Sequence, residues 1–370
     1  MGKKKGYLIL GNGEIFAGTS FGAQSGISGE VVFNTGMMGY PESLTDPSYY
    51  GQILTMTYPL IGNYGVPPQT MENGLLDNYE SEKIQIRGLI VSSYIDNNTH
   101  WQSKSTLSSW LKREGIPALS GIDTRTLTKI IREFGTMGGI ITFEGPRTKI
   151  GANFFYDINK ENLLPFVSCK TPIKYGNGIL KILLIDCGVK LNQIRMLLKY
   201  DTQILRVPWD YNPFAKNDFF HFDVIVISNG PGDARLAGET VQVIREAITR
   251  KIPILGICLG NQILALAAGG DIFKLKYGHR GQNQPVKDEL TNKCYITSQN
   301  HGFAVKTETL PKGWVPWFTN LNDRTNEGVR HSRLPFFSVQ FHPEATPGPT
   351  DTEWLFDYFI KETNRWLKKN

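Results

Sequence analysis

A cysteine on a predicted strand-to-helix turn is the residue in this sequence with the clearest capacity for chemistry. Cys258 stands between an apolar segment, residues 252–257, and a helix-like segment, residues 259–268, with Gly256 and Gly260 beside it. This spacing is typical of a nucleophile elbow, in which a strained turn lifts the reactive atom clear of the sheet. The glycines fit because a Cβ on either side would crowd the turn. The start of the following helix favours a thiolate, so we interpret Cys258 as an exposed, ionisable nucleophile.

A histidine and a carboxylate near the C-terminus could complete a catalytic triad with this cysteine. His342 and Glu344 follow an apolar run that begins at Phe336. On an extended segment, side chains two residues apart point to the same side, and Pro343 favours the extended conformation at the histidine. A carboxylate that orients an imidazole allows the ring to take the proton of a thiol. His301 is a second candidate base, but no carboxylate lies two residues after it.

The composition of the chain excludes several classes of protein. Its 370 residues, 40% hydrophobic and 20% charged, suit two ordinary globular domains. The four cysteines form no C-x-x-C pair and the six histidines no H-E-x-x-H motif, so we expect neither a disulfide framework nor a metal site. The sequence has no phosphate-binding G-x-x-x-x-G-K-[ST] loop, and its net charge of +6 is scattered, which argues against ATP and nucleic acid as ligands. Because no apolar run is long enough for a signal peptide or a membrane span, we expect a cytoplasmic protein.

The pattern of apolar residues divides the chain into two domains. Residues 1–150 contain short apolar segments separated by turns and predict a β-rich domain with helices, one of which has Asp123 as its N-cap. Residues 151–180 lose regular pattern and are predicted to be a linker. Residues 181–370 alternate apolar strands with helices, which predicts an α/β domain with a mostly parallel sheet covered by helices on both faces. Ligands of such sheets bind at the carboxyl ends of the strands, where Cys258 is placed.

Two polar segments could complete a site around the cysteine. The glycine-rich loop that contains Gly230 follows an apolar strand, and its N–H and that of Leu259 are candidates for an oxyanion hole. A plain tight turn is the alternative for this loop. In the other segment, Asn300 could hydrogen-bond the charged ends of an amino acid, and Gly302 would let a ligand approach the backbone. Gln262, one helical turn after the cysteine, could reach the same pocket.

These motifs together resemble the class I, or triad, glutamine amidotransferases. The similarity rests on the elbow, the glycine-rich loop and the final histidine motif, which are residues 256–262, 228–233 and 341–344. A narrower similarity is to the small, glutamine-hydrolysing chain of carbamoyl-phosphate synthetase, and it covers nearly the whole sequence. It rests on residues 277–285, 299–305 and 343–349, and on residues 34–40, 44–50, 58–63 and 121–128, which other amidotransferases lack.

The resemblance implies a reaction and a partner. Cys258 would attack the side-chain amide of glutamine, with His342 as acid and base and Glu344 orienting its ring. A γ-glutamyl thioester would form, ammonia would leave, and water would release glutamate. The ammonia would pass through an internal tunnel to a separate large chain, which makes carbamoyl phosphate from bicarbonate and ATP. Such a complex would serve pyrimidine biosynthesis, arginine biosynthesis or both.

The resemblance also implies which residues bind the substrate and where cofactors belong. No cofactor and no metal is expected on this chain, whereas ATP and Mg²⁺ are expected on the large partner chain. The expected glutamine-binding residues are Ser48, Gly230, Gly232, Leu259, Gln262, Asn300, Gly302 and Phe303.

The sequence departs from the family pattern at two positions, and three other functions compete with this interpretation. Asn261 stands where many relatives carry histidine, and Ala234 follows Asp233 where proline is usual. A glutaminase chain for anthranilate or guanylate synthesis would leave the first 150 residues unexplained. A silent activator of the partner commonly lacks the nucleophile, which is present here. A stand-alone hydrolase of γ-glutamyl peptides would not need the segment of residues 40–48.

Overall fold

The chain folds into two compact units. The computed structural model describes residues 4–145, 155–215 and 221–369. One unit comprises residues 1–72 and 76–161, and the other comprises residues 73–75 and 162–370. The predicted linker, residues 151–180, starts in a segment outside the described residues, and from residue 162 onward it belongs to the second unit.

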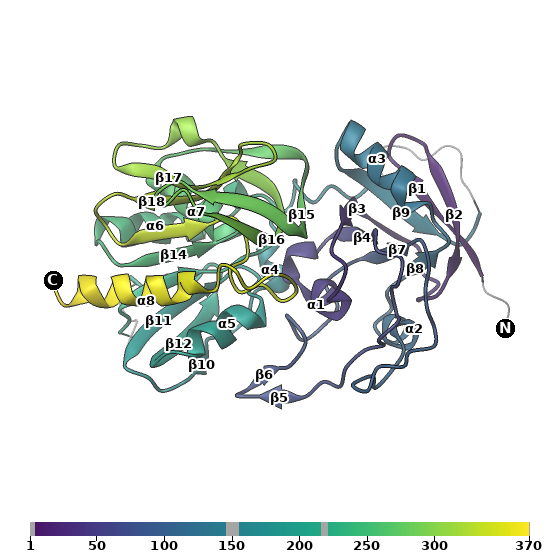
Figure 1. The fold of residues 1–370 in the computed structure, drawn as a ribbon, viewed down its shortest axis with the longest axis horizontal. Coiled ribbons are helices and arrows are strands. Elements are labelled where there is room, and N and C mark those ends of the chain that lie inside the picture. Colours follow the sequence, from purple (N-terminus) through teal and green to yellow (C-terminus); the bar gives the residue numbers. More distant parts are fainter. Residues whose placement is uncertain (1–3, 146–154, 216–220, 370) are drawn as a thin grey trace. The chain divides into compact units, whose positions relative to one another are not determined.

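The first unit is built on a sheet whose strands close on themselves (Figure 1). Neighbouring strands follow the order β1-β2-β8-β7-β4-β3-β9, and β9 pairs with β1. Strands β1 and β2 form an antiparallel hairpin, in which Gly13 supplies a positive φ of 91° at the turn. The strands are β1 Lys5–Leu10, β2 Ile15–Ser20, β3 Ile27–Asn34, β4 Gln52–Met56, β7 Gly88–Val91, β8 Ala118–Ser120 and β9 Met137–Thr142, and β5 Met71–Glu72 pairs separately with β6 Leu75–Leu76.

Polar side chains cap the start of the short 3₁₀ helix and of α2 and α3 in the first unit. Asp123 accepts a hydrogen bond from the backbone N–H of Thr126 at 2.9 Å, which confirms the predicted N-cap. Ser48 lies on a short 3₁₀ helix whose N-cap is Asp46. The helices are α1 Tyr40–Thr45, the 3₁₀ helix Pro47–Tyr49, α2 Leu107–Arg113 and α3 Thr124–Phe134.

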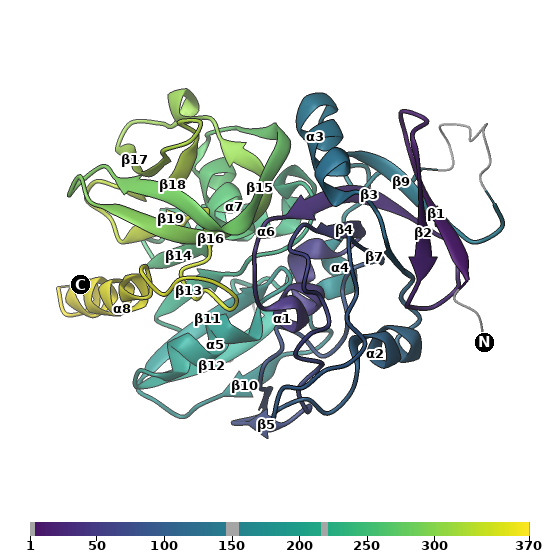
Figure 2. The same cartoon turned by 45° about the vertical axis from the view of Figure 1, so that its right-hand side comes forward.

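The second unit contains a ten-stranded mixed sheet with a parallel centre (Figures 1 and 2). The order is β10-β12-β11-β13-β14-β19-β18-β17-β15-β16. Its parallel centre consists of the neighbouring strands β12, β11, β13, β14 and β19. All pairs outside this centre are antiparallel. The strands are β10 Ile173–Tyr175, β11 Leu180–Asp186, β12 Thr202–Pro208, β13 Val224–Ile227, β14 Ile254–Ile257, β15 Ile272–Asp288, β16 Cys294–Val305, β17 Trp314–Asn320, β18 Asn326–His331 and β19 Phe336–Val339.

Helices cover both faces of the parallel centre. On one face, Ile244 of α6 and Ile263 of α7 pack with Ile225 of β13 in one hydrophobic core. On the other face, Phe356 and its neighbours from α8 lie over Leu255 of β14. The helices are α4 Leu164–Val167, α5 Leu191–Leu198, α6 Gly238–Thr249, α7 Leu259–Ala268 and α8 Trp354–Leu367, with 3₁₀ helices Ala234–Leu236 and Thr307–Thr309.

The predicted fold class is confirmed, with one difference in the sheet. A β-rich first unit precedes an α/β unit with helices on both faces, as the alternation of apolar segments indicates. The sheet is mixed, whereas a mostly parallel sheet was predicted. The four strands β15 to β18 follow one another without an intervening α-helix and pair in antiparallel. Among the described residues, every helix is too short or too polar to cross a bilayer.

Candidate active site

The turn after β14 has the strained geometry of a nucleophile elbow. Cys258 adopts φ 56° and ψ −101°, a backbone conformation that residues other than glycine rarely occupy. A Cβ at Gly256 would lie 2.4 Å from the carbonyl oxygen of Gly260, and a Cβ at Gly260 would lie 2.3 Å from that of Ile227. The two glycines are therefore required by contact with backbone, as the G-x-C-x-G spacing predicts.

The sulfur of Cys258 is buried, which corrects the expectation of an exposed atom. The side chain is 1% exposed, because two later segments, β16 and the residues after β19, lie against it. Its Sγ donates to the carbonyl oxygen of Asn300 at 3.6 Å and accepts from Nε2 of Gln340 at 3.7 Å. The neighbours of the sulfur are thus polar, unlike those of a structural cysteine in an apolar core.

His342 and Glu344 form the predicted pair beside the cysteine. His342 Nδ1 lies 2.7 Å from Glu344 Oε1, and the imidazole Nε2 is buried with no hydrogen-bond partner among the described residues. The backbone N–H of His342 donates to the carbonyl oxygen of Ser298 at 2.9 Å, which holds this segment against β16. Burial lowers the pKa of His342, but the charges of Glu344 and Cys258 outweigh burial and raise it above its ordinary value. The ring is therefore well suited to hold a proton taken from the sulfur.

Lys190, the N-cap of α5, and Gln193, within α5, support the triad carboxylate. Neither was predicted from the sequence. Lys190 Nζ lies 3.6 Å from Glu344 Oε1, and Gln193 Nε2 donates to the same oxygen at 3.0 Å. Burial raises the pKa of Glu344, but the charges of His342 and Lys190 outweigh burial and lower it to about 2. The carboxylate is therefore ionised at neutral pH, as an orienting group must be.

The glycine-rich loop lies beside the start of α7. A Cβ at Gly230 would lie 2.9 Å from the Leu259 side chain and 2.1 Å from the carbonyl oxygen of Cys187, so only glycine fits. Leu259 is the first residue of α7, where the backbone N–H has no partner within the helix. Gly232, in the same loop, has a positive φ of 84°. The structure brings the predicted oxyanion-hole residues together.

The remaining predicted binding residues lie on α7, on β16 and in the first unit. Gln262 Nε2 donates to the carbonyl oxygen of Phe303 at 3.1 Å, and its Oε1 is buried without a partner among the described residues. Asn300 and Gly302 belong to the same strand, β16, whose backbone reaches the sulfur. Ser48 is buried within the first unit.

The ring of His301, the alternative base, contacts groups other than the sulfur. Its Nδ1 lies 2.9 Å from the carbonyl oxygen of Phe303 and its Nε2 lies 3.3 Å from Gln299 Oε1. Burial and the neighbouring charge of His279 lower the pKa of His301 well below its ordinary value. Both ring nitrogens of His301 thus face other groups, whereas His342 Nε2 has no partner among the described residues and His342 interacts with the charge of Cys258, so the geometry favours His342.

Comparison with known proteins agrees with both units. Residues 8–141 match the family described as carbamoyl-phosphate synthase small chain, CPSase domain, and residues 183–362 match glutamine amidotransferase class-I. The chain is 47% identical to the carbamoyl phosphate synthase small chain of Pyrococcus furiosus over 363 residues, which covers 97% of each chain. The chain belongs to the carbamoyl-phosphate synthase small chain family. The resemblance drawn from the motifs is confirmed.

Longer proteins contain the same small-chain region. The chain is 50% identical over 358 residues to multifunctional protein CAD of Squalus acanthias, covering 96% of this chain and 16% of that protein. It is 48% identical over 359 residues to the human mitochondrial carbamoyl-phosphate synthase [ammonia], covering 96% of this chain and 23% of that protein. The chain thus spans less than a quarter of the length of these two relatives.

A second cluster of ionisable groups lies beside β16. His279 Nε2 lies 2.8 Å from Asp323 Oδ2, and its Nδ1 lies 3.2 Å from Glu327 Oε1. Ligand atoms of His279, His301 and Glu327 lie within 4.8 Å of one another, so among the described residues these three could hold a metal ion. A protonated His279, which donates from both nitrogens, satisfies the same geometry. Asn320 Nδ2 also donates to Glu327 Oε1 at 3.0 Å.

The charge on His279 predicts a loss of stability in alkali. Burial lowers the pKa of His279, but hydrogen bonds to Asp323 and Glu327 outweigh burial and raise it from 6.5 to about 9. A raised pKa in the folded state stabilises the fold below pH 6.5 and loses this contribution as the pH rises through about 9. We expect His279→Gln to cost about 3 kcal/mol of unfolding free energy at pH 6. That difference from the native chain should shrink steadily between pH 7 and pH 10, as measured by urea unfolding; a constant difference would contradict the assignment.

The two departures from the family pattern have local explanations. Asn261 is buried, and its Nδ2 donates to Gln340 Oε1 at 3.1 Å while its Oδ1 accepts from Ser338 Oγ at 2.8 Å. Ala234 starts a 3₁₀ helix whose N-cap, Asp233, accepts a hydrogen bond from the backbone N–H of Arg235 at 3.0 Å. Gln340, like Lys190 and Gln193, was missed, although alternation on an extended segment places it on the same side as His342.

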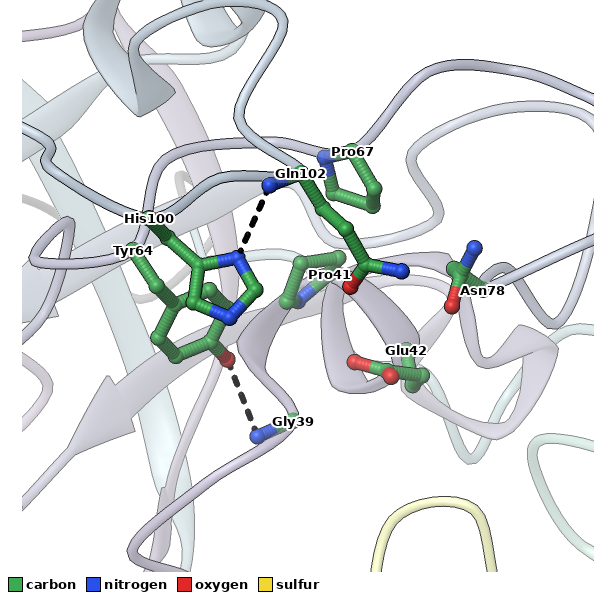
Figure 3. A pocket seen from close by; sticks show the side chains of 8 residues that line it. All are labelled: Gly39, Pro41, Glu42, Tyr64, Pro67, Asn78, His100 and Gln102. Atoms are coloured by element: carbon green, nitrogen blue, oxygen red, sulfur yellow. Dashed lines mark hydrogen bonds between the residues drawn. The ribbon is translucent and has the colours of Figure 1, made fainter.

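A cavity in the first unit is lined by none of the predicted site residues. It has a volume of about 260 Å³, and its lining includes Glu42, Tyr64 and His100 (Figure 3). The Tyr64 hydroxyl accepts from the backbone N–H of Gly39 at 3.0 Å, and His100 Nδ1 accepts from that of Gln102 at 3.2 Å. None of the residues assigned to glutamine binding lines this cavity.

Proposed function

We propose that this chain is the glutaminase subunit of a carbamoyl-phosphate synthetase. One observation supports the proposal above all: a buried thiol lies beside an imidazole whose far nitrogen is held 2.7 Å from a carboxylate. The near nitrogen of that imidazole has no hydrogen-bond partner among the described residues. A nucleophile, a base and an orienting acid in this order are the parts needed for acyl transfer from an amide.

The proposed reaction has two halves. In the first, the Cys258 thiol gives its proton to His342 Nε2 and the sulfur bonds to the side-chain carbonyl carbon of glutamine. The N–H groups of Gly230 and Leu259 would stabilise the oxyanion of the tetrahedral intermediate. The C–N bond then breaks, His342 returns the proton to the leaving nitrogen, and ammonia departs from a γ-glutamyl thioester.

In the second half, water cleaves the thioester. His342 takes a proton from the water, the hydroxide adds to the thioester carbonyl, and the C–S bond breaks to release glutamate. Proton transfer back to the sulfur restores the thiol, so the whole cycle consumes one glutamine and one water. Throughout, Glu344 would stabilise the imidazolium, and Lys190 and Gln193 hold that carboxylate in place.

Glutamine would be bound by the polar groups around this centre. Gln262 Oε1 is buried without a partner among the described residues, which suits an acceptor for the ammonium group or amide of a substrate. We assign the same role to the whole predicted set. The set is Ser48, Gly230, Gly232, Leu259, Gln262, Asn300, Gly302 and Phe303.

The partner in this proposal is a large synthetase chain. The relatives are named carbamoyl phosphate synthase small chain or are longer proteins that include this region. The large chain would combine the ammonia with bicarbonate and ATP, with ATP and Mg²⁺ bound there. The chemistry proposed for this small chain requires no cofactor. Transfer of ammonia through a tunnel and a cytoplasmic location remain predictions.

The second candidate function is a silent activator of the synthetase. It is worth testing because the human relative is named carbamoyl-phosphate synthase [ammonia], a name that specifies ammonia and not glutamine. The two functions differ in whether Cys258 is chemically competent. The position of the sulfur beside His342 favours the glutaminase.

Glutamine hydrolysis by the purified chain separates these functions. We expect slow release of glutamate by the small chain alone and faster release once the matching large chain is added. A γ-glutamyl dipeptide, supplied in place of glutamine, should be hydrolysed poorly. Absence of glutamate release both with and without the large chain would favour the silent activator, and efficient cleavage of the dipeptide would favour the stand-alone hydrolase.

A further inference from the structure

A buried glutamine, Gln340, touches the nucleophilic sulfur. It follows β19, is 0% exposed, and lies two residues before His342. Its backbone N–H donates to the carbonyl oxygen of Glu327 at 2.8 Å, which fixes the main chain at this point. Its side-chain Nε2 donates to Cys258 Sγ at 3.7 Å.

Neighbouring hydrogen bonds determine which end of the Gln340 amide faces the sulfur. The carbonyl oxygen of Phe303 can only accept, so the Gln262 atom 3.1 Å from it must be the amino group. The same amino group lies 3.3 Å from the Gln340 side chain, and the atom there must therefore be the oxygen Oε1. The Gln340 amino group therefore faces Cys258. This orientation of the amide follows from the Phe303 backbone carbonyl, which, unlike a side-chain amide, has only one possible orientation of its oxygen.

Asn261 adds a second donor to the same oxygen. Asn261 Nδ2 donates to Gln340 Oε1 at 3.1 Å, and Ser338 Oγ donates to Asn261 Oδ1 at 2.8 Å. Asn261, Ser338 and Gln340 are all 0% exposed, so water does not compete for these bonds. Two donors on Oε1 hold the Gln340 amide in one orientation.

The sulfur contacts two groups of opposite character. The Asn300 carbonyl oxygen accepts the thiol proton at 3.6 Å and therefore favours the neutral thiol. The Gln340 amino group donates toward the sulfur, and such a bond strengthens when its acceptor becomes an anion. Proton transfer from sulfur to His342 thus breaks the contact with Asn300 and strengthens the contact with Gln340.

We infer that Gln340 is a further catalytic residue, which stabilises the anionic sulfur of Cys258, and that Asn261 is the residue that positions it. The inference rests on the proposed function, because it supplies a second role in the same reaction. It also gives Asn261, a departure from the family pattern, a defined task. The oxyanion hole stabilises charge on oxygen, whereas Gln340 stabilises charge on sulfur, before the attack and when the thioester breaks.

The test measures how readily the sulfur becomes reactive as the pH rises. Cys258 alkylation by iodoacetamide is followed from pH 5 to pH 10 by mass spectrometry of its peptide, in a Cys294→Ser background that removes the exposed cysteine. For Gln340→Leu we expect the midpoint of the profile to move up by about one pH unit. For Gln340→Glu, whose carboxylate opposes a nearby anion, we expect a shift at least as large. The kcat for glutamine should fall about tenfold in Gln340→Leu, with KM changed less than about twofold.

Two further variants separate positioning from general disturbance. Asn261→Asp replaces the donor to Oε1 by an acceptor that attracts the Gln340 amino group away from the sulfur, so we expect a smaller upward shift of the midpoint. Gln85→Leu makes the same change as Gln340→Leu in a buried glutamine of the first unit, which donates to Ser81 Oγ at 2.9 Å. This control should keep the midpoint of the parent chain.

The outcomes are distinct. An unchanged midpoint in folded Gln340→Leu and Gln340→Glu would overturn the role of Gln340. If Gln340→Leu does not fold, Gln340→Glu and Asn261→Asp decide the question, since both keep the size of the side chain. The alkylation profile needs no glutamine, so a parent chain that fails to hydrolyse glutamine would refute the proposed function while the profile still tests Gln340.

Discussion

Replacement of Cys258 by serine should abolish glutamine-dependent synthesis while leaving ammonia-dependent synthesis intact. The serine hydroxyl is a poor nucleophile, and loss of a triad nucleophile lowers kcat by on the order of 10⁶. Because the large chain would accept free ammonia, carbamoyl phosphate should still form when ammonium chloride replaces glutamine. The measurement is carbamoyl phosphate production by the assembled complex with each nitrogen source.

The comparison between nitrogen sources provides the internal control. Serine differs from cysteine by one atom, and the strained backbone at φ 56° is the same for both residues. Loss of synthesis with both glutamine and ammonia would indicate a failure of folding or assembly. Glutamine hydrolysis by Cys258→Ser at the native rate would show that the assigned nucleophile is wrong.

Replacement of His342 by asparagine should slow formation of the thioester by on the order of 10³ to 10⁴. Asparagine can still donate a hydrogen bond to Glu344, but it cannot take the proton from the sulfur. Single-turnover mixing with labelled glutamine measures the rate of acylation separately from the release of glutamate. The KM for glutamine should change little, since the ring acts on a proton and does not hold the substrate.

His301→Asn is the matched comparison for this variant. His301 has a buried imidazole in the same region, but its Nδ1 lies 2.9 Å from the carbonyl oxygen of Phe303 and its pKa is lowered. We expect His301→Asn to reduce the acylation rate far less than His342→Asn does. A native acylation rate in His342→Asn, together with a large loss in His301→Asn, would reassign the base.

Local sequence pattern predicted the parts of the site that lie within single turns. Gly256 of the elbow, the Asp123 cap and the spacing of His342 and Glu344 each depend on residues fewer than five positions apart. Such short-range geometry follows from backbone sterics and alternation, which a sequence displays directly. The same alternation would have identified Gln340, which lies two residues before His342.

Long-range contacts could not be predicted in the same way. The sulfur is buried because the Asn300 carbonyl, 42 residues further along the chain, lies against it. Lys190 and Gln193 reach Glu344 across more than 150 residues. Glu327, which pairs with His279, was likewise invisible from spacing. Each of these contacts is set by the order of strands in the sheet, which periodicity does not specify.

Acid quenching of the chain during turnover tests the central claim most directly. The purified small chain, mixed with carbon-labelled glutamine and quenched in acid, should carry label on the Cys258 peptide as a thioester that hydroxylamine releases as γ-glutamyl hydroxamate. The same treatment of Cys258→Ser should leave that peptide without label. Label on any other residue, or glutamate released with no labelled peptide at any quench time, would contradict the account.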